Sequence, residues 1–261
     1  MRKSFDVVKV HCVAYIRRTQ TNFYMHSKTL ILDIEGTTTP ISFVSEILFP
    51  FASKQIGSFL ENNWDDPEVI TDVNALFIYA AEEVERTAQN AIRIARDLIF
   101  DDVKLTALKS LQGKIWRTGY QSGDLRGALF EDVAECIINW SKKHHIFIYS
   151  SGSVEAQKLL FGYSEAGDLC PYFEGHFDTK IGSKKDRSSY EKIAESLKLS
   201  GPDLYFLTDS EVEAGCAMDA DWNVILMTRP GNAALIDPKV ESLARCNSFP
   251  EVSALWSLNE S

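Results

Sequence analysis

The chain has 261 residues, of which 45% are hydrophobic and 25% charged, as in ordinary globular proteins with a substantial core. This length fits one large domain or two of modest size. The net charge of −10 argues against a nucleic-acid-binding surface as the main feature of the protein. An anionic substrate is not excluded, because a metal ion and a lysine can reverse the local field. No apolar run approaches the roughly 20 residues of a membrane span, so we expect no membrane partner.

The first 28 residues differ in charge from the rest. Six basic residues stand there against the single acid Asp6. Three interpretations are open: a mitochondrial presequence, a disordered arm, or an upstream extension with translation normally starting at Met25. We favour an extension, residues 1–28, that the fold does not need.

Cysteine usage bears on the compartment. The five cysteines are odd in number, widely spaced and free of any CxxC pair. This pattern favours buried thiols in a reducing intracellular compartment and speaks against a zinc site. We therefore expect a cytoplasmic protein, with the nucleus as a second location and mitochondrial import through residues 1–28 as the alternative.

An apolar run, residues 29–32, ends abruptly at Asp33, and Glu35 follows two residues later. The run predicts a buried parallel strand, and open α/β sheets bind their ligands at the carboxyl ends of such strands. Because side chains alternate along a strand, the two acids would share one side. Two carboxylates before a Gly/Thr loop suggest a Mg²⁺ site with a carboxylate nucleophile. The competing interpretation is a strand ending in a solvated turn.

Residues 41–120 show helical spacing throughout and contain no strand that ends in a ligand loop. Pro50 should bend or break the first of these helices. A cluster of glycines then resembles a hinge: Gly113, Gly119, Gly123 and Gly127.

From residue 130 onward, strands and helices alternate. Strands are expected at 146–149, near 175–179, at 204–207 and at 223–227, with helices between them. Such repeated units predict an α/β fold with a mostly parallel sheet and helices on both faces. The helical block would be an insertion after the first strand.

Polar groups follow three of the expected strands: Asp33, Ser150 and Asp209, with Gly182-Ser183-Lys184 between the last two. One acid at one strand end is weak evidence, but this combination is much stronger. In this order the residues resemble the four motifs of the haloacid-dehalogenase-like hydrolases. That resemblance implies a Rossmann-like core, residues 29–40 and 121–261, with an inserted all-helical cap, residues 41–120.

Longer segments resemble one family more closely, the enolase-phosphatases of methionine salvage. They are residues 32–40, 149–157 and 175–182 in the core, 106–117 in the cap, and 229–233 near the end. Glu35 also departs from most phosphatases of the superfamily, which have Asp at that position. The resemblance implies conversion of 5-(methylthio)-2,3-dioxopentyl phosphate, through its enol-phosphate, to an acireductone and phosphate.

The same resemblance implies a role for each site residue. Asp33 would attack phosphorus to give an aspartyl-phosphate, and Glu35 would act as acid and then base. One Mg²⁺ per subunit would bind Asp33, the main-chain carbonyl of Glu35, and Asp209. Phosphate would be held by Ser150, Ser151 and Lys184, while Glu213 would orient a metal-bound water. Lys180 and Lys185 flank Lys184 and remain alternatives for the active lysine.

Other functions stay open on the sequence alone. A phosphatase for another small metabolite would use the same core, because caps set specificity. A haloalkanoate dehalogenase would use the same nucleophile without a metal, and an inactive scaffold would need none of these side chains. We expect a monomer that binds a small phosphorylated substrate and no nucleic acid.

Deleting residues 1–24 should leave Mg²⁺-dependent phosphatase activity nearly unchanged, because the family resemblance begins after this segment. The comparison is between the full chain and a protein that starts at Met25, assayed for phosphate release and solubility. An insoluble or inactive truncated protein would show that the extension belongs to the fold.

Overall fold

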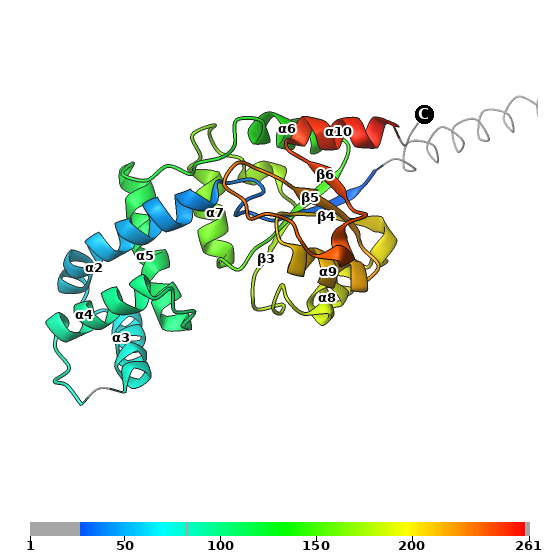
Figure 1. Ribbon diagram of the computed structural model, residues 1–261. Helices are drawn as coiled ribbons and strands as arrows, with labels where there is room; N and C mark the ends of the chain where they lie inside the picture. Colours follow the sequence, from blue (N-terminus) through cyan, green and yellow to red (C-terminus); the bar gives the residue numbers. More distant parts are fainter. Residues whose placement is uncertain (1–26, 82, 259–261) are drawn as a thin grey trace, which may run out of the picture.

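The computed structural model describes residues 27–81 and 83–258, and its centre is a six-stranded parallel sheet (Figure 1). The strand order is β3-β2-β1-β4-β5-β6. In chain order the strands are β1 Thr29–Leu32, β2 His145–Tyr149, β3 Gly175–Phe177, β4 Leu204–Thr208, β5 Asn223–Met227 and β6 Ala244–Cys246. No helix in this part of the chain is long and apolar enough to cross a bilayer.

Helices cover both faces of the sheet and complete a three-layer core. One face packs against α6 (Val133–Trp140), α7 (Val154–Gly162) and α10 (Phe249–Leu258). The other face packs against α8 (Arg187–Leu197) and α9 (Glu211–Asp219). This arrangement confirms the predicted α/β fold with a parallel, Rossmann-like sheet.

Strand β1 shows how the sequence builds these layers. Leu30 and Leu32 belong to the hydrophobic cluster on one face, and Ile31 belongs to the cluster on the other. All three side chains are fully buried. Because successive side chains of a strand point to opposite faces, a continuous apolar run is needed where both faces are covered. From Leu30 to Leu32 the strand therefore has no polar side chain, and the next polar side chain is that of Asp33.

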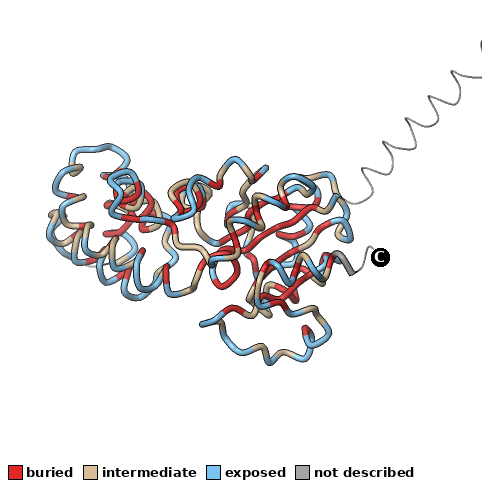
Figure 2. The backbone as a smooth tube through the Cα atoms, turned by 90° about the horizontal axis from the view of Figure 1, so that it is seen from above, coloured by how far each residue is buried: buried red, intermediate tan, exposed pale blue. Residues whose placement is uncertain are grey.

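The segment between β1 and α6 forms a separate helical cap. Its helices are α2 (Phe49–Asn62), α3 (Pro67–Ala80), α4 (Ala88–Phe100) and α5 (Thr106–Ser122). They share a hydrophobic core of their own, and Figure 2 shows buried backbone inside the cap as well as in the sheet. The expected boundary at residue 120 falls inside α5, so the exact division of domains stays a prediction.

Pro50 does not break the first cap helix as expected. It lies in the first turn of α2, directly after a π-helical segment, Phe43–Leu48. The N–H of Phe49 bonds to the carbonyl of Val44, five residues back. The π-turn accommodates a residue that lacks an N–H and would clash in a regular helix.

Two of the four expected hinge glycines, Gly119 and Gly127, lie where a side chain would clash with a neighbouring element. A Cβ on Gly127 would lie 2.0 Å from the main-chain oxygen of Leu160, and one on Gly119 would lie 2.5 Å from the Phe51 ring. Only Gly123, at φ +85°, adopts the left-handed conformation that ends a helix, at the end of α5. Close approach between elements therefore accounts for two of these glycines, and a helix end accounts for a third.

Gly127→Ala should destabilise the protein by about 1–3 kcal/mol, because the methyl group would meet main chain that cannot move aside. Gly113→Ala is the matched control, since a Cβ there meets nothing within 4 Å. In a helix interior this control should be stabilising by about 0.5–1 kcal/mol. Urea unfolding of both variants checks the prediction, and a neutral Gly127→Ala would contradict it.

Candidate active site

The candidate site lies where the strand order changes direction. Strand β1 lies between β2 and β4, and the chain crosses from one side of it to the other after β3. Asp33 follows β1 and Asp209 follows β4, so both acids stand at the carboxyl end of the sheet. Open α/β sheets form their ligand crevice at such a switch point.

Asp33 is buried and held on both carboxylate oxygens. Its Oδ1 atom lies 2.5 Å from the Nζ of Lys184 and accepts a hydrogen bond from the N–H of Ile34 at 2.7 Å. Its Oδ2 atom accepts a bond from the hydroxyl of Thr208 at 3.2 Å. Both torsions of the carboxylate are thereby fixed, as a positioned nucleophile requires.

Lys184 is the lysine that reaches the site. Its side chain is 4% exposed, whereas Lys180 and Lys185 are exposed to solvent. The ammonium lies between Asp33 and Glu213, 2.6 Å from the latter. Burial opposes its positive charge, but the two carboxylates outweigh burial and raise the pKa of Lys184. It therefore remains a cation at neutral pH.

The carboxylate of Glu213 is engaged by Lys184 and Thr208. Its Oε2 atom accepts a hydrogen bond from Thr208 at 3.0 Å in addition to the ion pair with Lys184. Thr208 thus joins Asp33 and Glu213 through one hydroxyl. Burial and the charge of Asp33 raise the pKa of Glu213. The geometry makes Glu213 a support for Lys184, while the expected role in orienting a metal-bound water stays a prediction.

The loop after Asp33 is not the solvated turn of the competing interpretation. Thr37, Thr38 and Thr39 are fully buried, and their N–H groups all point at the carbonyl of Ile34. Side chains from the distant segment 229–233 hold the same loop. Arg229 donates to the carbonyl of Thr37, and Asn232 donates to the carbonyl of Gly36.

Asp209 packs directly on this loop. A Cβ on Gly36, which has φ +69°, would lie 2.2 Å from Oδ2 of Asp209, so only glycine leaves room for the carboxylate. Burial and the charge of Asp33 raise the pKa of Asp209 to about 7. For Glu35, the surrounding protein displaces water and Asp33 adds negative charge, and both raise the pKa of this carboxyl.

This donor set fits a hard divalent cation. Within residues 27–81 and 83–258 no three acidic, His or Cys side chains form a metal-holding group. The expected set needs only two side chains, Asp33 and Asp209, with a main-chain carbonyl as the third donor. Oxygen donors with surplus negative charge suit Mg²⁺, and a cation there would reverse the rise in carboxyl pKa.

Ser150 and Ser151 follow β2 and begin the turn into α7. Ser150 is buried and Ser151 exposed, and the next helix is capped by Ser153, whose hydroxyl accepts from the N–H of Ala156. Serine is among the residues most favoured at such a helix N-cap. The turn exposes the N-terminus of α7, where an anion is favoured.

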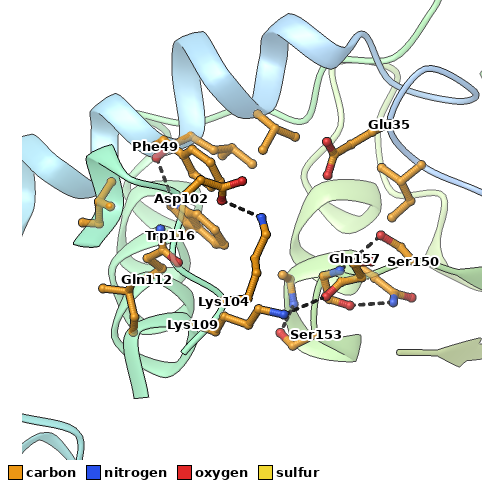
Figure 3. A pocket seen from close by; sticks show the side chains of 18 of the residues that line it. Glu35, Phe49, Asp102, Lys104, Lys109, Gln112, Trp116, Ser150, Ser153 and Gln157 are labelled. Carbon is orange, nitrogen blue, oxygen red and sulfur yellow. Dashed lines mark hydrogen bonds and ion pairs between the residues drawn. The ribbon is translucent and has the colours of Figure 1, made fainter. Parts of the chain in front are cut away.

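A cavity of about 120 Å³ lies between the cap and this turn (Figure 3). Its core side carries Glu35, Ser150 and Ser151, and its cap side carries Lys104 and Lys109. A further part of its lining is apolar and comes from the cap: Val44, Leu48, Phe49, Leu98, Ile99, Val103, Leu108 and Trp116. A phosphate at the polar end would leave an apolar chain to extend into the cap.

Several residues near the site were not predicted from the sequence. Thr208 precedes the expected ligand Asp209 directly, and that adjacency is the signal that was available. Trp116 has a packing role: its ring stacks on Phe49 and its Nε1 donates to the carbonyl of Leu48. Asp102 and Lys104 left no signal, because only the fold brings the cap loop to the core.

Solved structures define the class of protein. The chain is 33% identical to the UTR4 protein of Saccharomyces cerevisiae, with a TM-score of 0.72, covering 85% of this chain and 98% of that one. It also shares the fold of the haloacid-dehalogenase-type hydrolase YfnB of Bacillus subtilis, solved bound to magnesium, at 14% identity and a TM-score of 0.55 over 88% and 99% of the two chains. The fold is that of the haloacid-dehalogenase-like hydrolases.

Curated relatives narrow this class to a family. The chain is 44% identical to enolase-phosphatase E1 of Aquifex aeolicus over 78% of its length and 91% of that protein. It is 43% identical to the Drosophila mojavensis protein of the same name over 90% and 98%. A longer relative in Aedes aegypti is matched over 22% of its own length. No protein-family model matches.

The chain belongs to the enolase-phosphatase E1 family. Its function is that of an enolase-phosphatase of methionine salvage, a hydrolase of phosphoric monoesters.

Asp33→Asn should abolish phosphate release, because an amide is a poor nucleophile and a poor metal ligand. The measurement is inorganic phosphate released with excess Mg²⁺. Lys185→Met, which changes an exposed neighbour of Lys184, should retain activity and serves as the control. Substantial turnover by Asp33→Asn would contradict the covalent mechanism.

Stability should depend on pH when no divalent metal is present. Asp209 titrates at about 7 in the folded protein and at about 4 when unfolded. The folded state then holds a proton that the unfolded chain releases, so stability falls as pH rises from about 4 to about 7. Asp33→Asn should reduce this fall, and Mg²⁺ should do the same in wild type. Equal urea midpoints at pH 5 and pH 8 in chelator would contradict it.

Proposed function

We propose that this site converts 5-(methylthio)-2,3-dioxopentyl phosphate into its enol-phosphate and then into an acireductone and phosphate. The observation that supports this most is that a charged region at the sheet edge adjoins an apolar cavity under the cap. A carboxylate held by Lys184 and Thr208 lies beside Glu35, and Glu35 opens onto a cavity whose cap side is apolar. The polar end suits a phosphate and dicarbonyl, and the apolar end suits a methylthio chain.

In the phosphatase half, the Oδ2 atom of Asp33 is the proposed nucleophile. Oδ1 is engaged by Lys184 and by the N–H of Ile34, so Oδ2 carries the weaker contact. Lys184 offsets charge on the phosphoryl oxygens as the aspartyl-phosphate forms. Glu35 protonates the leaving oxygen and then takes a proton from the attacking water.

One Mg²⁺ per subunit is the proposed cofactor, held by Asp33, Asp209 and the main-chain carbonyl of Glu35. When bound, it neutralises phosphate charge and polarises oxygen atoms near it. The chain's own contribution is the close packing of Asp209 on Gly36, which brings the second acid onto the nucleophile loop.

We further propose a monomer in the cytoplasm and also in the nucleus. The mitochondrial alternative depends on residues 1–28, of which 1–26 lie outside the described residues. Size-exclusion chromatography with light scattering tests the first point. A reporter fused to residues 1–28 tests the second, because import into mitochondria would overturn it.

The diketone phosphate should give an enol-phosphate, seen by its ultraviolet absorbance, before free phosphate appears. The reason is chemical: the carbon between a carbonyl and the phosphate oxygen is acidic, and the enol is conjugated with the second carbonyl. Stopped-flow absorbance beside a phosphate assay measures the order of events. Release of phosphate from simple esters and the diketone alike, with no enol, would favour a phosphatase for another small metabolite.

A further inference from the structure

The loop between α4 and α5 lines the cavity, and one of its residues, Asp102, has a backbone conformation that is unusual for aspartate. Asp102 has φ +49°, in the left-handed region that glycine usually occupies at the end of a helix. The N–H of Val103 bonds to the carbonyl of Leu98, and that of Asp102 to Ile99, which closes the helix end. An aspartate here costs backbone energy that glycine would avoid, so its side chain is a reason to look for function.

That side chain faces the cavity together with Lys104. The Oδ1 atom of Asp102 lies 2.5 Å from the Nζ of Lys104, and both residues line the cavity. Figure 3 shows the ammonium extending from the cap into the space that Glu35 borders on the opposite side. The pair is half-exposed, with side-chain exposures of 53% and 64%, so it is open to a ligand that enters.

Asp102 and Lys104 line the cap side of the cavity, opposite the core side at which we expect the phosphate to bind. A phosphate near Asp33 and Ser150 places the phosphate-bearing carbon, C1, past Glu35, with the C2 carbonyl further toward the cap. The acidic C1–H and the C2 oxygen are the two positions at which enolisation moves protons. Asp102 and Lys104 supply one acceptor and one donor on that side of the cavity.

We propose that Asp102 and Lys104 of the cap catalyse the enolisation half-reaction of the diketone phosphate. This inference deepens the proposed function and rests on it. It assigns the proton transfers at C1 and C2 to the cap and leaves Glu35 to the phosphate ester oxygen.

The step balances without any further reactant. The Asp102 carboxylate takes the proton from C1, and the C1–H electron pair becomes the C1=C2 double bond. The carbonyl π pair moves to the C2 oxygen, which takes a proton from the Lys104 ammonium. The proton on Asp102 then passes to the neutral amine across the 2.5 Å contact and restores the ion pair. The product is the enol-phosphate, an isomer of the substrate.

Two assignments compete with this one. Glu35 lies on the same cavity and also carries a carboxylate, but it is needed in acid form at the neighbouring ester oxygen. Lys109 is the other cap cation in the lining, and its Nζ donates to the main-chain oxygen of Ser151, 3.3 Å away. That contact directs the Lys109 ammonium to the turn after β2, whereas the Lys104 ammonium extends toward the space that Glu35 borders (Figure 3).

The test separates enolisation from hydrolysis with a phosphonate analogue of the diketone, in which a CH₂ group replaces the ester oxygen. The full-length Mg²⁺-loaded enzyme cannot cleave it, so hydrogen exchange at C1 in D₂O, followed by proton NMR, reports enolisation alone. Asp102→Asn and Lys104→Met should each slow exchange at least about 100-fold. The dissociation constant of the phosphonate should change much less.

Two further variants define the mechanism. Lys104→Arg keeps a cation but cannot release a proton at neutral pH, so it should bind the phosphonate and exchange slowly. Asp101→Asn is the matched control: it removes the same charge from an exposed neighbour that does not line the cavity, and exchange should match wild type.

Each other outcome has a distinct meaning. Exchange at the wild-type rate in Asp102→Asn or Lys104→Arg would overturn the proton relay. A fall in phosphonate affinity that equals the fall in exchange rate would indicate a packing role and also overturn it. No exchange by wild type would instead refute the enolase half of the proposed function, before any variant is compared.

Discussion

The buried ammonium of Lys184 is the constraint on which the rest of the site depends. An unpaired charge at this depth would be too costly to keep, so Asp33 and Glu213 must lie against it. These three residues come from the loop after β1, the segment before α8, and helix α9. Pairing one cation therefore fixes three separate parts of the core relative to one another, and Thr208 joins the two carboxylates from β4.

Even with this pairing, the site contains more carboxyl groups than cationic side chains. Lys184 offsets one negative charge, whereas Asp33, Asp209 and Glu213 lie close together, and Glu35 adds a fourth carboxyl nearby. The raised pKa of Asp209 and Glu213 expresses this surplus. This surplus of negative charge favours the binding of a cation. A bound cation would in turn reduce the repulsion between these carboxylates and a phosphate dianion. The electrostatics thus couple metal binding to substrate binding within one network.

The sequence predicted the parts of this arrangement that are local in the chain. Asp33 ends an apolar run, Asp209 follows another, and the Gly-Ser-Lys spacing singled out Lys184. Strand β6 was missed because its three residues, Ala244–Cys246, form no apolar run, although they pair with β5.

Contacts between distant segments could not be predicted in the same way. The glycines near 120 look like a hinge in sequence, yet Gly127 is small because Leu160 passes beside it. Arg229 and Asn232 hold the loop after Asp33 from nearly 200 positions away. Such pairs depend on the packing of the sheet, and no pattern of neighbouring residues reports them.

The contacts that join cap and core show how the two halves of the reaction can share one cavity. Arg117 pairs with Glu155 of α7, and Lys109 reaches the carbonyl of Ser151, but both links are exposed to solvent. Exposed pairs of this kind contribute about 0–1 kcal/mol each. Buried contacts also cross this boundary, since Phe51 and Trp116 pack against the hydrophobic clusters of both cap and core. A substrate whose phosphate binds the core and whose apolar chain binds the cap would add contacts across the same boundary, on the side of the cavity where Asp102 and Lys104 lie.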